Sequence, residues 1–144
     1  MINVLITGAN RGLGLGFVKK YLEKNVHVLC TTRDISGSKE LLECKERYPN
    51  NIEIFELDLL KENGAKTLAN QLNGMPIDIL INNAGVGSSN QHFEAVSSKP
   101  WLEVLKVNLI APLIITQSLF ENVKKSSAKK IYFLSSQLGS IGDN

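Results

Sequence analysis

Short apolar runs alternate along this chain with segments whose apolar residues recur at helical spacing. The apolar runs predict β-strands over residues 2–6, 26–31, 52–57, 77–81 and 130–134. The segments between them predict helices over residues 12–24, 38–48, 62–72 and 99–123. Strands that alternate with helices pair in parallel through right-handed crossovers. The pattern therefore favours an α/β fold with a doubly wound parallel sheet of about five strands.

Three local features indicate which strands are buried and where two of the helices begin. The runs at residues 2–6, 77–81 and 130–134 are almost continuously apolar, which is typical of strands buried on both faces. Ser38 opens the second helix, and we expect its hydroxyl to cap that helix. Pro100 lies near the start of the last helix, where a missing N–H costs little, so we expect one long helix that ends at residue 123.

The chain has 144 residues and a formal net charge of +2. The length suits one domain with a hydrophobic core, and the charge is too small to favour nucleic acid or a membrane surface as a partner. The longest apolar-rich stretch, residues 107–119, is interrupted by polar residues and is too short to span a bilayer. Cys30 and Cys44 form no CxxC pair, and no histidine stands at ligand spacing. We therefore expect no metal site and two reduced thiols in a cytoplasmic protein.

The most informative segment is T-G-A-N-R-G-L-G at residues 7–14, between the first strand and the first helix. A sharp strand-to-helix turn needs residues without Cβ, and such a turn lets a diphosphate approach the N–H groups of the helix N-terminus. Closely spaced glycines also occur in plain turns, but the strand before and the amphipathic helix after favour a dinucleotide site. The predicted cofactor-binding residues of this turn are Thr7, Gly8, Asn10, Arg11, Gly12, Leu13 and Gly14.

Further motifs stand at the ends of later strands. They are Asp58-Leu59, the N-N-A-G segment at residues 82–85 and the S-S-x-x-G segment at residues 135–139, with a V-N-L stretch around Asn108 in the last helix. Their order and spacing resemble the short-chain dehydrogenase/reductase family over essentially the whole chain. Within the family, T-G-A-N-R-G-L-G together with T-x-R-D most resembles carbonyl reductases of the C-factor and sniffer-like type. The resemblance implies a Rossmann-like, single NAD(P)-binding domain over residues 1–144.

The resemblance also implies roles for single residues around the cofactor. Asp58 and Leu59 would contact the adenine ring. Asn83, Ala84 and Gly85 would support the fourth strand and line the cofactor cleft. These five residues complete the predicted cofactor site together with the glycine turn and one arginine after the second strand.

That arginine, Arg33, bears on the choice of cofactor. NAD-binding members of the family place an acidic side chain at the end of the second strand, where this chain has Thr32 and Arg33. A guanidinium fork suits a ribose 2′-phosphate, and Arg11 in the glycine turn can add a second positive charge. Asp34 lies one step beyond the contact by resemblance. We expect NADP(H) to be preferred over NAD(H), the alternative being that both arginines are merely solvated.

Two further residues would act in catalysis. The resemblance implies that Ser136 is the catalytic serine, which hydrogen-bonds the substrate oxygen. It implies that Asn108 is the active-site asparagine, which kinks its helix and holds a water in the proton relay. The family's main acid/base is a tyrosine with a lysine four residues later, a little over a dozen residues beyond the serine. No Tyr-x-x-x-Lys occurs in this chain, so we expect a family member that lacks its C-terminal portion after the fifth strand.

Two functions stay open on this reading. The first is an NADP-dependent, carbonyl reductase-like oxidoreductase that transfers a hydride between NADPH and a carbonyl or alcohol, and that is inactive without the tyrosine and lysine. The second is a non-catalytic dinucleotide-binding or interaction module. The expected partners are a small-molecule carbonyl substrate and a second copy of the chain, which could associate through the exposed edge of the fifth strand.

Overall fold

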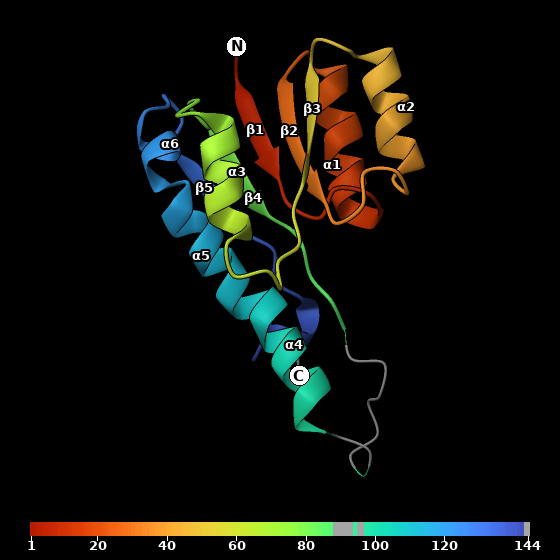
Figure 1. Ribbon diagram of the computed structural model, residues 1–144, viewed down its shortest axis with the longest axis vertical. Coiled ribbons are helices and arrows are strands. Elements are labelled where there is room, and N and C mark those ends of the chain that lie inside the picture. Colours follow the sequence, from red (N-terminus) through yellow and green to blue (C-terminus); the bar gives the residue numbers. More distant parts are fainter. Residues whose placement is uncertain (88–93, 95–96, 143–144) are drawn as a thin grey trace.

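One sheet of five parallel strands organises the molecule (Figure 1). The computed structural model describes residues 1–87, 94 and 97–142. The strands are β1 (Asn3–Ile6), β2 (His27–Thr32), β3 (Ile52–Glu56), β4 (Ile79–Asn82) and β5 (Lys130–Phe133), in the order β3-β2-β1-β4-β5. The chain winds outward from β1 to β3 and then returns to the other side of β1 with β4. This confirms the α/β, Rossmann-like doubly wound fold, in which ligands bind beyond the strand ends where the winding reverses.

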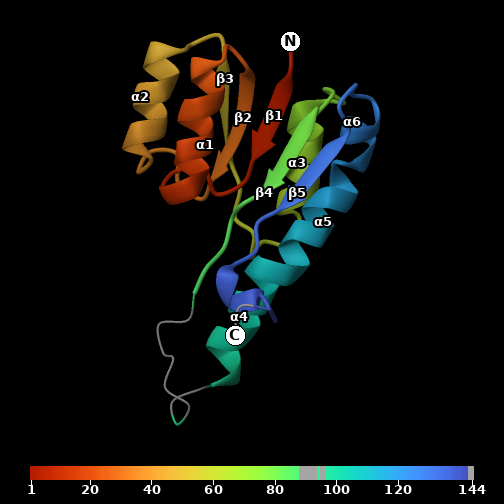
Figure 2. The ribbon, with the colours of Figure 1, turned by 180° about the vertical axis from the view of Figure 1, so that it is seen from behind.

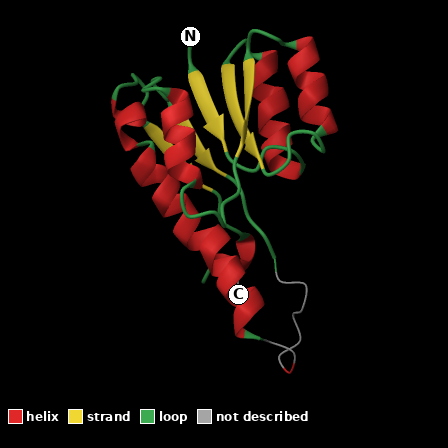
Figure 3. Cartoon of the chain, in the orientation of Figure 1, coloured by secondary structure: helices red, strands yellow, loops and turns green. Residues whose placement is uncertain are grey.

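Helices cover both faces of the sheet (Figures 1 and 2). The helices α1 (Gly12–Glu23) and α2 (Lys39–Arg47) lie on one face, and α3 (Gly64–Leu72), α5 (Ala111–Ser118) and α6 (Phe120–Lys124) lie on the other. Figure 3 shows the strands as the middle layer between these two sets of helices. Among the described residues, no helix is both long and apolar enough to cross a membrane.

The central strands are buried on both sides, as their apolar runs predict. Val4 and Ile6 of β1 pack with residues of α1 and α2, whereas Leu5 packs with residues of α3 and α5. All three side chains have 0% exposure. Cys30 and Cys44 are buried and form no disulfide, and burial raises the pKa of the Cys30 thiol to about 12.

The segment after β4 differs from the single helix expected over residues 99–123. It consists of α4 (Ser98–Leu105), a π-helical turn (Lys106–Ile110), α5 and α6. Pro112 has no N–H, so it cannot continue the α-helical hydrogen-bond pattern. The Ala111 N–H bonds instead to the Lys106 carbonyl, five residues back, which widens the helix at Asn108.

The helix α2 also begins differently from the prediction. It starts at Lys39, directly after Ser38, but the Ser38 hydroxyl does not cap it. The hydroxyl donates to the Asp34 carbonyl oxygen at 2.5 Å, and its oxygen lies 3.0 Å from Thr32 Oγ1. The expected Ser38 cap is therefore wrong, because this hydroxyl is committed to the turn between β2 and α2.

The strand β5 forms one edge of the sheet, and its apolar run does not lead to burial on both faces. Tyr132 and Phe133 expose 49% and 58% of their surfaces, and Leu109 in the π-helical turn exposes 66%. Unpaired backbone groups beside exposed apolar side chains form a template for association with another chain.

We predict that the isolated chain self-associates through β5. Replacing Phe133 by Lys would place a charge at this edge and should shift the protein toward monomer in size-exclusion chromatography with light scattering. Leu60→Lys is the matched control, since Leu60 is an exposed apolar residue that follows β3 at the opposite edge of the sheet. A wild-type chain that stays monomeric at high concentration would contradict the prediction.

Candidate functional site

The turn between β1 and α1 favours glycine at two positions. Gly8 and Gly12 have φ angles of +63° and +56°, which side chains rarely adopt. A Cβ at Gly8 would also lie 2.8 Å from the Ala84 Cα, so the turn and the segment after β4 are in close contact. A Cβ placed on Gly12 would have no other atom within 4 Å, so the space beside this residue is open.

Asn83 joins this turn to the end of β4. Its side-chain Nδ2 donates to the carbonyl oxygens of Thr7 and Gly8 at 2.8 and 2.9 Å. In return, the Thr7 hydroxyl accepts the N–H groups of Asn83 and Ala84, both at 3.1 Å. Thr7, predicted to bind cofactor, is 1% exposed and lies beneath the turn, where it holds the turn in place.

The N-terminus of α1 opens toward solvent and presents polar groups. Arg11 occupies the position before the helix, and no side chain of the described residues caps it. The first turn of α1 contains no acidic residue. The unpaired N–H groups and the helix dipole together make this end a favourable place for an anion.

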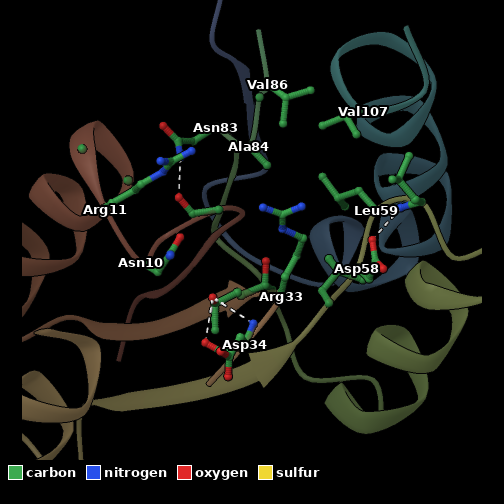
Figure 4. Close-up of a pocket in the computed structure, with 18 of the residues that line it drawn as sticks. Asn10, Arg11, Arg33, Asp34, Asp58, Leu59, Asn83, Ala84, Val86 and Val107 are labelled. Atoms are coloured by element: carbon green, nitrogen blue, oxygen red, sulfur yellow. Dashed lines mark hydrogen bonds between the residues drawn. The ribbon is translucent and has the colours of Figure 1, made fainter. Parts of the chain in front are cut away.

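A cavity of about 720 Å³ lies beyond the carboxyl ends of the strands, next to this helix end. Figure 4 shows Arg33 projecting into it from the end of β2, with Asn10 and Arg11 on one side and Asp58 and Leu59 on the other. Twelve of the predicted cofactor-binding residues line it: Gly8, Asn10, Arg11, Gly12, Leu13, Gly14, Arg33, Asp58, Leu59, Asn83, Ala84 and Gly85.

Sequence reasoning missed part of the lining of this cavity. Pro100, Glu103, Val104 and Val107 contribute a wall from α4 and the π-helical turn. Thr31, Thr32, Gly37, Ser38, Leu57, Leu60, Val86 and Gly87 also line it. Helical spacing places Val104 and Val107 on one face, but only the packing of the segment against the sheet shows what this face meets.

The two charged residues after β2 differ in orientation. Arg33 is exposed and reaches into the cavity, whereas the Asp34 carboxylate bonds within its own turn. Asp34 Oδ1 accepts the Ser36 hydroxyl at 2.6 Å and the Gly37 N–H at 3.0 Å. These hydrogen bonds hold the pKa of the Asp34 carboxyl below its usual value.

A second cavity, of about 380 Å³, contains both residues predicted to act in catalysis. Ser136 lines it from the segment after β5, and Asn108 lines it from the π-helical turn. The Asn108 side chain accepts the Val86 N–H at 2.9 Å and donates to the Val86 carbonyl oxygen at 2.8 Å. Asn82 also lines this cavity, and its Oδ1 is a buried atom without a partner among the described residues. The fold thus brings Ser136 and Asn108 together, although 28 positions separate them in the sequence.

Comparison with known proteins agrees with the fold. The sequence model of the short chain dehydrogenase family matches residues 2–143. An uncharacterized oxidoreductase of Schizosaccharomyces pombe is 30% identical over 141 residues, which are 96% of this chain and 55% of the relative. The chain therefore spans about half the length of this curated relative.

Two solved structures have the same fold over nearly the whole chain. The NADPH-bound carbonyl reductase from chicken fatty liver is 36% identical, with a TM-score of 0.88 over 98% of this chain and 62% of that protein. The carbonyl reductase Sniffer of Drosophila melanogaster is 31% identical, with a TM-score of 0.86 over 100% of this chain and 65% of that protein.

We predict that Asn83→Ala destabilises the fold. The carbonyl oxygens of Thr7 and Gly8 would lose their side-chain donor, which costs on the order of 1–3 kcal/mol for a group shielded from water. Urea unfolding followed by circular dichroism measures this change. Asn51→Ala, which removes an exposed side-chain hydrogen bond to Asn25, is the control and should stay within about 0.5 kcal/mol of wild type. Equal effects of the two substitutions would show that the Asn83 bonds do not hold the turn.

Proposed function

Because the chain belongs to the short chain dehydrogenase family, we propose that it forms the cofactor half of an NADP-dependent, carbonyl reductase-like oxidoreductase. The observation that carries this proposal is the placement of two arginines at the large cavity. Arg11 and Arg33 line it, and the end of β2 offers Thr32 where an acidic residue would favour NAD. When bound, NADPH supplies the hydride that reduces the carbonyl carbon of a small-molecule substrate.

The residues of the large cavity fit such a dinucleotide. The open space at Gly12 and the uncapped N–H groups of α1 suit the diphosphate. The guanidinium groups of Arg33 and Arg11 suit the 2′-phosphate, since they can form charge-assisted hydrogen bonds with it. Asp58 and Leu59, at the far wall, would hold the adenine.

The second cavity would receive the substrate beside the cofactor. Ser136 would donate a hydrogen bond to the substrate carbonyl oxygen and stabilise negative charge that develops on it. Asn108 would hold the segment after β4 in position through its two bonds to Val86. The general acid of the family is absent from this sequence, which contains no Tyr-x-x-x-Lys.

A second candidate function is a non-catalytic dinucleotide-binding module. It is favoured by one observation: twelve of the predicted cofactor-binding residues line the large cavity, whereas the sequence has no Tyr-x-x-x-Lys to protonate a substrate. Cofactor binding is common to both candidates, and the absence of turnover fits both; turnover that depends on Ser136 would exclude the non-catalytic module.

We predict that the chain binds NADP more tightly than NAD. Arg33→Ala should weaken NADP binding by on the order of 1–3 kcal/mol, the scale of a lost charge-assisted hydrogen bond, and should leave NAD binding nearly unchanged. Isothermal titration calorimetry with each nucleotide measures both values. Arg47→Ala is the control, because Arg47 lies over the Tyr48 ring at the end of α2 and does not line the cavity. Equal dissociation constants of the wild-type chain for NADP and NAD would refute the preference.

We also predict that the purified 144-residue chain reduces carbonyl compounds very slowly or not at all. General acid catalysis contributes roughly 10²–10⁴-fold to the rate, and this chain has no Tyr-x-x-x-Lys to supply it. NADPH oxidation, followed by absorbance with a panel of aldehydes and ketones, should match the rate of Ser136→Ala. Rapid turnover that falls in Ser136→Ala would show that another group supplies the proton and would rule out the non-catalytic module.

A further inference from the structure

A carboxylate beside the 2′-phosphate position poses a problem for a site that binds NADP. Asp34 directly follows Arg33, and both residues line the large cavity. A free carboxylate there could accept a ribose hydroxyl, which favours NAD, or pair with the Arg33 guanidinium in place of the phosphate. Either event would cancel the advantage that Arg33 gives to NADP.

The turn between β2 and α2 opposes this by holding the carboxylate in an orientation that faces away from Arg33. Oδ1 of Asp34 accepts hydrogen bonds from the Ser36 hydroxyl and the Gly37 N–H. The other oxygen, Oδ2, lies so close to Gly37 that a Cβ there would be 2.5 Å from it. Among the ion pairs of the described residues, none joins Asp34 to Arg33. Figure 4 shows the two side chains pointing in opposite directions.

Two buried hydroxyls fix the backbone beneath this carboxylate. Thr32 and Ser38 are each 3% exposed, and their side-chain oxygens lie 3.0 Å apart. The Ser38 hydroxyl donates to the Asp34 carbonyl oxygen, and the Thr32 hydroxyl accepts the Asp34 N–H at 3.4 Å. The main chain at Asp34 is thus held from both sides, which also fixes the direction in which Arg33 leaves the strand.

We propose that the turn of residues 32–38 determines cofactor choice by sequestering the Asp34 carboxylate, so that Arg33 remains available to a 2′-phosphate. Asp34, Ser36 and Gly37 are positioning residues in this account, since they act through Arg33. The proposal rests on the NADP preference proposed above. It adds that a neighbouring acidic residue is tolerated only because Gly37 leaves room for its carboxylate.

The test compares two probes that differ only in the 2′-phosphate, adenosine 2′,5′-bisphosphate and adenosine 5′-phosphate. For each variant of the full chain, calorimetry gives the dissociation constant of adenosine 5′-phosphate divided by that of adenosine 2′,5′-bisphosphate, a ratio that is high when the 2′-phosphate is preferred. Gly37→Ala should displace the carboxylate and lower this ratio by about tenfold, because a like charge then lies near the phosphate. Gly16→Ala is the matched control, since a Cβ at Gly16 meets nothing within 4 Å and this residue does not line the cavity.

A double variant distinguishes the effect of the Asp34 charge from the effect of a distorted turn. In Gly37→Ala combined with Asp34→Asn the displaced group is neutral, so the ratio should return close to the wild-type value. A ratio that stays low in the double variant would mean that the turn is distorted, and it would overturn the proposed role of the carboxylate.

Substitutions at Ser36 test the same contact without crowding the turn. Ser36→Ala removes a hydrogen bond to Asp34 and should lower the ratio, whereas Ser36→Thr keeps the hydroxyl and should preserve it. An unchanged ratio in both Gly37→Ala and Ser36→Ala would overturn the inference and leave the proposed function standing. A wild-type ratio near one, or no effect of Arg33→Ala, would instead refute the NADP preference itself.

Discussion

The hydrogen bonds between Asn83 and the glycine turn are the constraint on which the rest of the site depends. They join the end of β1 to the end of β4, the two neighbouring strands between which the winding of the sheet reverses. Glycine adopts the φ angles of +63° and +56° without strain, so the turn needs outside contacts only to fix its position against the sheet. The Asn83 amide and the Thr7 hydroxyl supply these contacts, and the open N-terminus of α1 is directed toward the cavity as a result.

From this junction the site extends in two directions with different chemistry. Toward β2 and β3 it carries charges of both signs, because Arg11 and Arg33 line the cavity together with Asp58 and with Asp34, whose carboxylate is bound within its turn. Toward β5 it is uncharged, with polar residues such as Asn108 and Ser136 and apolar residues such as Phe133 around a smaller cavity. The large cavity thus suits an anionic dinucleotide, and the smaller one suits a neutral substrate.

The π-helical turn links these two regions. Widening the helix at Asn108 lets its side-chain amide pair with both backbone groups of Val86, so the segment after β4 is held against the π-helical turn. Val86 and Val107 both line the large cavity. A local irregularity that begins with the missing N–H of Pro112 therefore shapes both cavities at once.

The sequence alone determined the five strands, the first three helices and twelve of the 25 residues that line the large cavity. Apolar periodicity and the need for glycine at Gly8 and Gly12 are local properties, so they can be found without knowing what lies nearby. The partners of polar side chains were decided only by the tertiary structure. The Ser38 hydroxyl bonds to Asp34 instead of capping α2, and the Asn108 amide binds Val86. A hydrogen bond depends on which groups the packed elements bring within about 3 Å, and no residue pattern along the chain specifies that.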